Sequence, residues 1–388
     1  MKPNKSVAWI IALAVLVFDM GTHAAPQTGE LTKSSTLNPK TAKPQIEVCF
    51  VLDTTGSMSG LIEGAKQKIW SIANEMISAK PPPDIKFGLI GYRDRGDEYV
   101  TKVFNLTDDI DGIYAHLQSF NAAGGGDTPE SVNEALNDAV SRMTWSTNRH
   151  VLKIIFLVGD APPHMDYPNG PKYPDVCKDA MKRDLIINTI QCGMMGETTP
   201  IWKEIAQLSE GSYAAIGQTG NMIAITTPVD KELAELNCKI GTTLIGYGDE
   251  PVRRLTLSKQ VASEAAAPAV LADRLSYNVR SGKAVQGGGE LLDAVANGTV
   301  KLDSIQKEKL PAELQKLNAE ELRTYVEKQQ KQRAELQSQV RELNEKRQAY
   351  IDAEKKRLAA KGSGDAFDGK VAEMIRAQAA KKGIAYGK

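Results

Sequence analysis

Hydroxyl and carboxylate side chains occupy alternate positions directly after a strongly apolar segment. Residues 46–52 read Ile-Glu-Val-Cys-Phe-Val-Leu, and Asp53, Thr55 and Ser57 follow. A run rich in β-branched and large apolar residues is typical of a buried parallel strand. Open α/β sheets bind their ligands at the carboxyl ends of such strands. Because hard oxygen donors suit Mg²⁺, Ca²⁺ or Mn²⁺ better than zinc, the spacing predicts a divalent-cation site.

Two later segments place further oxygen donors near predicted strand ends or helix starts. A second strongly apolar segment ends in Gly159-Asp160, and three glycines at 124–126 precede Asp127 and Thr128. The glycines permit unusual backbone angles and close approach of neighbouring groups. In a doubly wound sheet such loops can lie side by side along one edge. We therefore expect these segments to lie near the Asp53 loop.

Strand-like and helix-like segments alternate from residue 46 to about residue 245. This alternation predicts an α/β fold with a doubly wound, mostly parallel six-stranded sheet. A short charged segment joins the strand-like residues 85–92 and 99–106, which predicts a hairpin and therefore one antiparallel edge strand. A helix through about 230–240 is expected to close the domain.

The oxygen donors and their setting resemble the von Willebrand factor type A (VWA) domain, which is also seen as the integrin I domain. The metal-ion-dependent adhesion site (MIDAS) of that family reads Asp-x-Ser-x-Ser, with a Thr on a second loop and an Asp on a third. The resemblance covers roughly residues 45–245. It is carried by Val51-Leu52-Asp53-Thr54-Thr55-Gly56-Ser57-Met58 and by Leu157-Val158-Gly159-Asp160.

The resemblance implies a cation, most simply Mg²⁺ with Ca²⁺ or Mn²⁺ as alternatives, at Asp53, Thr55, Ser57 and Asp160. Thr55 replaces a Ser of the family pattern and keeps the hydroxyl. In such sites the two Asp residues hold the ion largely through waters, whereas the two hydroxyls bind it directly. A coordination position stays open for an Asp or Glu of a protein partner. Few direct protein charges keep the cation electrophilic toward that carboxylate.

The second loop departs from the family pattern. When its glycines are laid on those of the family, the ligand Thr position falls on Asp127, and Thr128 is one residue further on. Either residue is a candidate ligand, and the alternative for Thr128 is a helix cap. The partner is expected to contact the loop tops around Ser57, Gly125, Asp127 and Asp160.

Enzymatic alternatives depend on His164, which follows Asp160 by four residues. A metal-dependent hydrolase or enzyme subunit would combine His164 with Ser57 and the same ion. No oxyanion hole or nucleophile elbow surrounds Ser57 in the sequence. Residues 124–126 also lack the spacing of a phosphate-binding loop. We expect a binding module without enzymatic activity.

Composition and the N-terminal residues indicate an exported protein. The 388 residues include 48 basic and 48 acidic ones, so no overall charge attracts nucleic acid or anionic membranes. Lys2 and Lys5 precede the apolar residues 7–18, and small residues favour cleavage between Ala24 and Ala25. As a helix the apolar run spans roughly 18 Å, well short of a ~30 Å hydrocarbon core. We predict a periplasmic or secreted protein with no stable membrane span after cleavage.

Four cysteines lie in the predicted mature chain. Export permits disulfides, and four cysteines allow three pairings. A buried, unpaired Cys49 is an equally good interpretation. The sequence therefore leaves the pairing open among Cys49, Cys177, Cys192 and Cys238.

The chain beyond about residue 245 changes character. No core can be derived for the Ala- and Gly-rich part, and the charged segment after it lacks proline and glycine. Polar residues at Gln329, Arg333 and Arg347 interrupt its apolar seam, so half-buried packing or weak coiled-coil self-association is expected. A structural, self-associating envelope protein is therefore a further alternative.

The predicted organisation is a signal peptide at 1–24, a linker at 25–44, the VWA domain at 45–245, short helices and loops at 246–317, a long charged helix at 318–361, and a tail with an amphipathic helix at 362–388.

Overall fold

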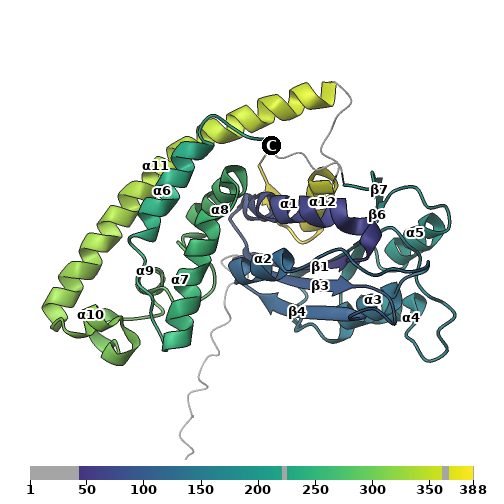
Figure 1. The fold of residues 1–388 in the computed structure, drawn as a ribbon, viewed down its shortest axis with the longest axis horizontal. Coiled ribbons are helices and arrows are strands. Elements are labelled where there is room, and N and C mark those ends of the chain that lie inside the picture. The colour runs from purple at the N-terminus through teal and green to yellow at the C-terminus, as the bar shows by residue number, and fades with distance from the viewer. Residues whose placement is uncertain (1–42, 221–224, 361–366, 388) are drawn as a thin grey trace, which may run out of the picture. The chain divides into compact units, whose positions relative to one another are not determined.

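The computed structural model describes residues 43–220, 225–360 and 367–387 (Figure 1). The predicted signal peptide lies outside the described residues, as does the linker apart from residues 43 and 44. In the described part of the chain, no helix is long and apolar enough to cross a membrane.

A six-stranded sheet forms the centre of the domain, in the order β4-β3-β1-β5-β6-β7. Neighbouring strands are parallel except for β3 and β4, which form the predicted antiparallel pair at the edge. The predicted fold class is therefore confirmed. The strands are β1 (Gln45–Asp53), β3 (Asp84–Tyr92), β4 (Thr101–Thr107), β5 (Leu152–Gly159), β6 (Ile186–Cys192) and β7 (Tyr213–Ile216).

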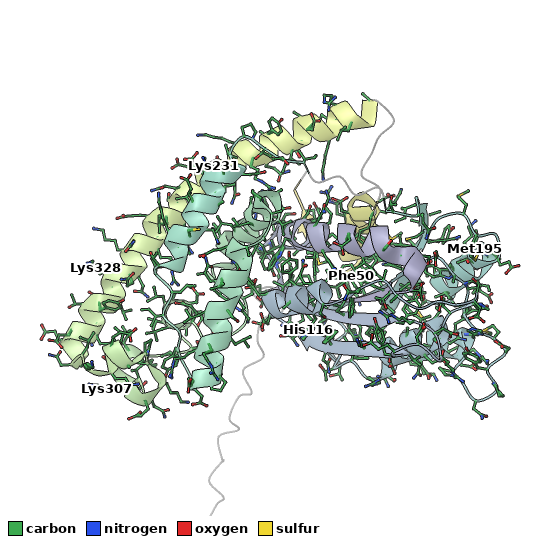
Figure 2. All side chains as sticks on the ribbon, in the orientation of Figure 1. Phe50, His116, Met195, Lys231, Lys307 and Lys328 are labelled. Carbon is green, nitrogen blue, oxygen red and sulfur yellow. The ribbon has the colours of Figure 1, made fainter. Side chains whose placement is uncertain are left out.

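Helices cover both faces of the sheet, which explains why the central strands are apolar almost throughout. Every residue of β5 is buried, and so is every residue of β1 except Gln45. Phe50 of β1 stacks on Phe156 of β5 at 5.4 Å between ring centroids, on the side of the sheet that faces α1 (Figure 2). One face carries α1 (Ser59–Ile77) and α2 (Ile110–Gln118), and the other carries α3 (Val132–Ser141), α4 (Tyr173–Lys182) and α5 (Thr198–Leu208).

A helix from the far end of the chain completes this core. The last helix, α12 (Phe367–Lys381), lies beside α1 (Figure 1). Its apolar face joins the same buried cluster as β1, α1 and β5. Gln378 of α12 and Asn188 of β6 exchange two buried hydrogen bonds of 3.0 and 2.6 Å. Nearby, β8 (Ala385–Tyr386) pairs with β2 (Ala79–Lys80).

The expectation that a helix at 230–240 closes the domain is wrong. The helix exists as α6 (Asp230–Gly241), but it packs against α8 (Pro268–Ser281) and α11 (Ala319–Ala360) (Figure 1). Its buried residues Leu233, Leu236 and Ile240 belong to a separate apolar cluster with those two helices. The apolar face of an amphipathic helix predicts that the helix packs against an apolar surface. The sequence of the helix does not predict which surface that is.

The chain after residue 245 has the core that its sequence did not reveal. One apolar cluster lies between α6, α8 and α11, and a second lies around Ile245, Leu291 and Val326. The remaining helices of this helical region are α7 (Glu250–Glu264), α9 (Leu291–Ala296) and α10 (Ala312–Gln315). Single-turn 3₁₀ helices lie at Leu302–Ser304 and Lys307–Lys309, and another follows β1 at Gly56–Met58.

The two arginines in the seam of α11 have partners within the chain, whereas the buried Oε1 of Gln329 has no hydrogen-bond partner. Arg333 bonds to Glu290 and Asp293, and Arg347 bonds to Asp230 and Asp273. Both arginines are buried. The imperfect heptad pattern therefore reflects packing against the helical region.

All four cysteines are free thiols. Cys49, Cys177 and Cys192 are buried, and Cys238 is exposed. Burial raises the pKa of the three buried thiols well above the ordinary value. Since the thiolate is the reactive form, these buried cysteines act as core residues.

Candidate metal centre

Three loops meet where the sheet reverses its order of connection. From β1 the chain moves outward to β3 and β4, and later returns to β5 on the other side of β1. Loops on either side of such a point diverge and leave a crevice at the carboxyl ends of the strands. Asp53 ends β1 and Asp160 directly follows β5, so this topology brings both carboxylates to the same edge.

The first loop (residues 53–58) brings one carboxylate and two hydroxyls together. Asp53 is fully buried, and its Oδ1 accepts hydrogen bonds from the Thr55 backbone N–H at 2.8 Å and the Thr55 hydroxyl at 2.6 Å. The Thr55 and Ser57 hydroxyl oxygens lie 3.3 Å apart. Ser57 is exposed, whereas Thr55 is buried. The oxygen atoms of this loop thus extend from the buried Asp53 to the exposed Ser57.

The second oxygen of Asp53 has no hydrogen-bond partner. Its Oδ2 is buried and unpaired. Burial, and to a lesser extent the charge of Asp160, raise the pKa of Asp53 to about 7, although the bonds from Thr55 oppose the shift. A buried acceptor left unpaired costs about 1–3 kcal/mol, and more when it is charged. A cation at Oδ2 would remove this cost.

Asp160 lies close to the first loop and contacts a fourth segment of chain. Its Oδ2 accepts a 2.6 Å hydrogen bond from the amide of Gln218, in the loop after β7. The same amide lies 3.3 Å from the backbone carbonyl of Ser57. Gln218 therefore joins the first and third loops. Gln218 was not predicted as a site residue, since a single polar residue after the last strand carries no distinguishing pattern.

Asp127 and Thr128 are not drawn into this cluster. Both are exposed, and within the described residues neither side chain makes a hydrogen bond to the first loop. The expectation that Thr128 caps the following helix is wrong, because α3 begins at Val132 with Ser131 in the capping position.

Glu130 is the acidic residue of the second loop (residues 121–131) that turns inward. It is 4% exposed, and its Oε2 has no hydrogen-bond partner. Burial, then the charge of Asp53 and the further carboxylates around it, raise the pKa of Glu130 to about 9. Glu130 was not among the candidate ligands predicted from the sequence. An acidic residue close after a glycine-rich loop was the signal that could have identified it.

Gly125 allows Glu130 and the first loop to approach each other. Its φ is +72°, and a Cβ at this position would lie 2.8 Å from Thr55 Cβ and 2.9 Å from Glu130 Oε1. Any side chain at 125 would therefore collide with both residues and strain the backbone. The contact places the Glu130 carboxylate beside Thr55.

His164 is buried, and its ring contacts residues outside the first loop. Its Nδ1 lies 2.7 Å from Asp166 Oδ1, and its ring stacks on Tyr167 at 4.1 Å between centroids. Its Nε2 lies 3.3 Å from Asp94 Oδ2 but lacks hydrogen-bond geometry. Within the described residues, no contact joins His164 to Ser57.

The donors at this edge are all oxygen atoms. Across residues 43–220, 225–360 and 367–387, no three His, Cys, Asp or Glu side chains are arranged to hold a metal by themselves. The cluster instead combines carboxylates with the Thr55 and Ser57 hydroxyls, which is a donor set for a hard divalent cation. The unpaired, buried Asp53 Oδ2 fits a role as a cation ligand or as the acceptor of a cation-bound water.

Comparison with known families identifies the domain that carries this site. Residues 47–223 match the family model described as von Willebrand factor A domain. These residues form a VWA domain. The predicted resemblance is confirmed.

The curated relatives match this chain over only a small part of their own length. The von Willebrand factor A domain-containing protein 7 of Rattus norvegicus is 32% identical over 157 residues, covering 40% of this chain and 15% of the relative. A putative ariadne-like RING finger protein, R811, of Acanthamoeba polyphaga mimivirus is 22% identical over 225 residues, which cover 53% of this chain and 22% of the relative. This chain spans less than a quarter of the length of these relatives.

Solved structures are similar to less than half of this chain. Proximal thread matrix protein 1 from the mussel byssus has a TM-score of 0.36 and 15% identity, covering 45% of this chain and 42% of that chain. One structure of that protein has a zinc-occupied MIDAS motif. An aerotolerance-related membrane protein from Bacteroides fragilis has a TM-score of 0.31 and 16% identity, and the match covers 45% of this chain and 92% of that chain.

Proposed function

We propose that the VWA domain is a metal-dependent protein-binding module for adhesion or assembly. A divalent cation at Asp53, Thr55, Ser57 and Asp160 would take an Asp or Glu side chain from a partner protein. The observation that carries this proposal is the fully buried Asp53 carboxylate, which keeps one unpaired oxygen beside two hydroxyls. VWA domains are generally protein-interaction modules, and this general role supports the proposal.

The burial of the donors indicates how the site would work. Asp53 and Thr55 form a rigid base, and the exposed Ser57 lies at the surface where a partner's carboxylate can arrive. The bound cation supplies a charge that attracts and orients that carboxylate. We expect Mg²⁺ in this role, with Ca²⁺ or Mn²⁺ as alternatives. The partner would contact the loop tops around Ser57, Gly125, Asp127 and Asp160.

Substitution of Asp53 tests the cation site directly. We expect Asp53→Ala to lower Mn²⁺ affinity by more than about 100-fold, since even residues that only support a metal's ligands are worth 10–100-fold. Isothermal titration of the full chain with Mn²⁺ measures this loss. Asp303→Ala is the matched control, because the Asp303 side chain is 82% exposed in a surface ion pair with Arg323. Unchanged Mn²⁺ affinity in Asp53→Ala would contradict the proposed site.

Partner binding should depend on the same ion. A protein captured from envelope extract by the wild-type chain should be released by EDTA and should not bind Asp53→Ala. A partner that stays bound under both conditions would exclude the cation from the interface.

We also propose that the module is exported and has no enzymatic activity of its own. The buried His164 contacts Asp94 and Asp166, which supports the view that it is not the base of a hydrolytic site at Ser57. The proposed signal peptide at residues 1–24 predicts a mature protein that begins at Ala25. Intact-mass measurement on protein from the periplasm or medium checks this start. A mature chain that still carries Met1 would contradict cleavage.

A further inference from the structure

We infer that Glu130 supplies the second-loop carboxylate of the cation site, so that three carboxylates lie near the ion where the family pattern has two. This inference rests on the proposed cation site and specifies its composition. Glu130 would take the place that the sequence pattern offered to Asp127 or Thr128.

The backbone holds Glu130 against the third loop (residues 160–172), which carries Asp160. The Glu130 N–H donates to the Pro162 carbonyl at 3.0 Å, and the His164 N–H donates to the Glu130 carbonyl at 3.1 Å. These two bonds make a short parallel bridge between the second and third loops. These bonds hold the backbone from which the Glu130 side chain extends.

The side chain of Glu130 points toward the first loop. Its Oε1 and the Thr55 Cβ both lie within 3 Å of the point that a Cβ on Gly125 would occupy. Its Oε2 is buried and has no hydrogen-bond partner. Asp53 Oδ2 is likewise buried and has no hydrogen-bond partner. Two carboxylates that each keep a buried oxygen without a partner thus lie close to Thr55.

Two neighbouring acidic residues, Asp94 and Asp97, do have hydrogen-bond partners. Asp94 accepts hydrogen bonds from the hydroxyls of Ser131 and Tyr167. Asp97 Oδ2 accepts from the backbone N–H groups of Asp94 and Gly125. Asp94 and Asp97 therefore have hydrogen-bond partners for their carboxylates, whereas Glu130 Oε2 has none.

The nearby arginines bind other groups. Arg93 donates to the carbonyls of Thr54 and Asn121 and forms an ion pair with Glu98. Arg95 pairs with Glu134. Since an unpaired buried charge costs several kcal/mol, Glu130 needs a cation from outside the chain or must bind a proton. A divalent ion shared with Asp53 supplies the first option.

The third carboxylate changes what the site does. A divalent ion with Asp53 and Asp160 is neutral, whereas the same ion with Glu130 added carries one net negative charge. The ion is then held more tightly and attracts a partner's carboxylate less strongly. Glu130 would shift the site toward stable ion retention and weaker, more readily reversible capture of an acidic partner.

Titration of the full chain with Mn²⁺ tests this inference without a partner. We expect Glu130→Gln, which keeps the shape and removes the charge, to lower Mn²⁺ affinity about 10–100-fold. Glu98→Gln is the matched control, because it removes the same charge from a side chain that is 67% exposed on the neighbouring hairpin. The control should change the affinity by less than about twofold, as screened surface charges do.

Thermal unfolding separates a ligand from a structural residue. The rise in melting temperature on adding Mn²⁺ should shrink in Glu130→Gln, because stabilisation by a ligand follows its affinity. Wild-type Mn²⁺ affinity in Glu130→Gln, with binding lost in Asp53→Ala, would overturn the inference and leave the proposed function intact. Wild-type affinity in both variants would overturn both proposals.

Discussion

A chain truncated after residue 360 is expected to lose cooperative unfolding. The truncation removes α12, which is part of the VWA core although it lies at the far end of the sequence. A chain that ends near residue 245, at the boundary predicted from the sequence, would lack α12 as well. The removed apolar side chains are Phe367, Val371, Met374, Ile375 and Ala379, all buried.

The expected loss is comparable to the whole stability of a domain. Burying one large apolar side chain contributes about 1.5–3 kcal/mol, so Phe367, Val371, Met374 and Ile375 together contribute roughly 6–12 kcal/mol. Native domains are stable by only about 5–15 kcal/mol. Removal of α12 also exposes the apolar surfaces of α1 and the sheet that it covers. We therefore expect a protein that aggregates or unfolds without a sharp transition.

A single substitution measures the same contact in a chain that still folds. We expect Phe367→Ala to lower the free energy of unfolding by about 3–5 kcal/mol, as for other buried Phe residues. Lys370→Ala is the control on the same helix, because the Lys370 side chain is 48% exposed and should change stability by less than about 0.5 kcal/mol. Urea unfolding followed by circular dichroism reports both values. A wild-type midpoint in Phe367→Ala would show that α12 does not belong to the core.

The second large effect is expected at Arg333, which joins α11 to the helical region. Its Nη1 donates to Glu290 Oε2 at 2.8 Å and to Asp293 Oδ1 at 3.0 Å. Its Nη2 donates to Glu290 Oε1 at 3.0 Å and to the Thr243 carbonyl at 2.7 Å. Since these groups are buried, Arg333→Ala would leave two carboxylates without a counter-charge. We expect a loss of about 3–5 kcal/mol.

The control and the pH dependence distinguish charge from packing. Arg323→Ala on the same helix removes an arginine whose side chain is 55% exposed and should cost less than about 1 kcal/mol. Burial and the charge of Glu290 raise the pKa of Asp293, and Arg333 opposes this shift. A carboxyl with a raised pKa destabilises the fold when it ionises, so the loss should be smaller at pH 5 than at pH 8. Equal losses at both pH values would assign the effect to packing.

Local sequence patterns were sufficient to predict the fold class and the part of the site formed by Asp53, Thr55, Ser57 and Asp160. The apolar runs before Asp53 and Asp160 predict buried strands, and the ends of parallel strands share one edge of a sheet. The alternation of Asp53, Thr55 and Ser57 within one short loop was sufficient to predict that their oxygens converge. These predictions needed only neighbours in sequence and the general geometry of α/β sheets.

Long-range packing lay beyond such patterns. The apolar face of α12 is evident in the sequence, but its contact with α1 joins segments about three hundred residues apart. Arg333 and Arg347 appear as defects in a heptad seam, although each has buried acidic partners on other helices. Only the tertiary structure shows which surface an amphipathic helix meets and which charge a buried arginine neutralises.

The second loop shows the same limit within the site itself. Spacing and glycine count favoured Asp127 or Thr128, yet both side chains are exposed and Glu130 points inward. The direction of Glu130 depends on its backbone bonds to Pro162 and His164 and on the space left by Gly125. The sequence by itself therefore determined the fold class and predicted a cation site of the VWA type at the Asp53 loop. The tertiary structure decided which acidic residue faces it, because backbone bonds between two loops set that orientation.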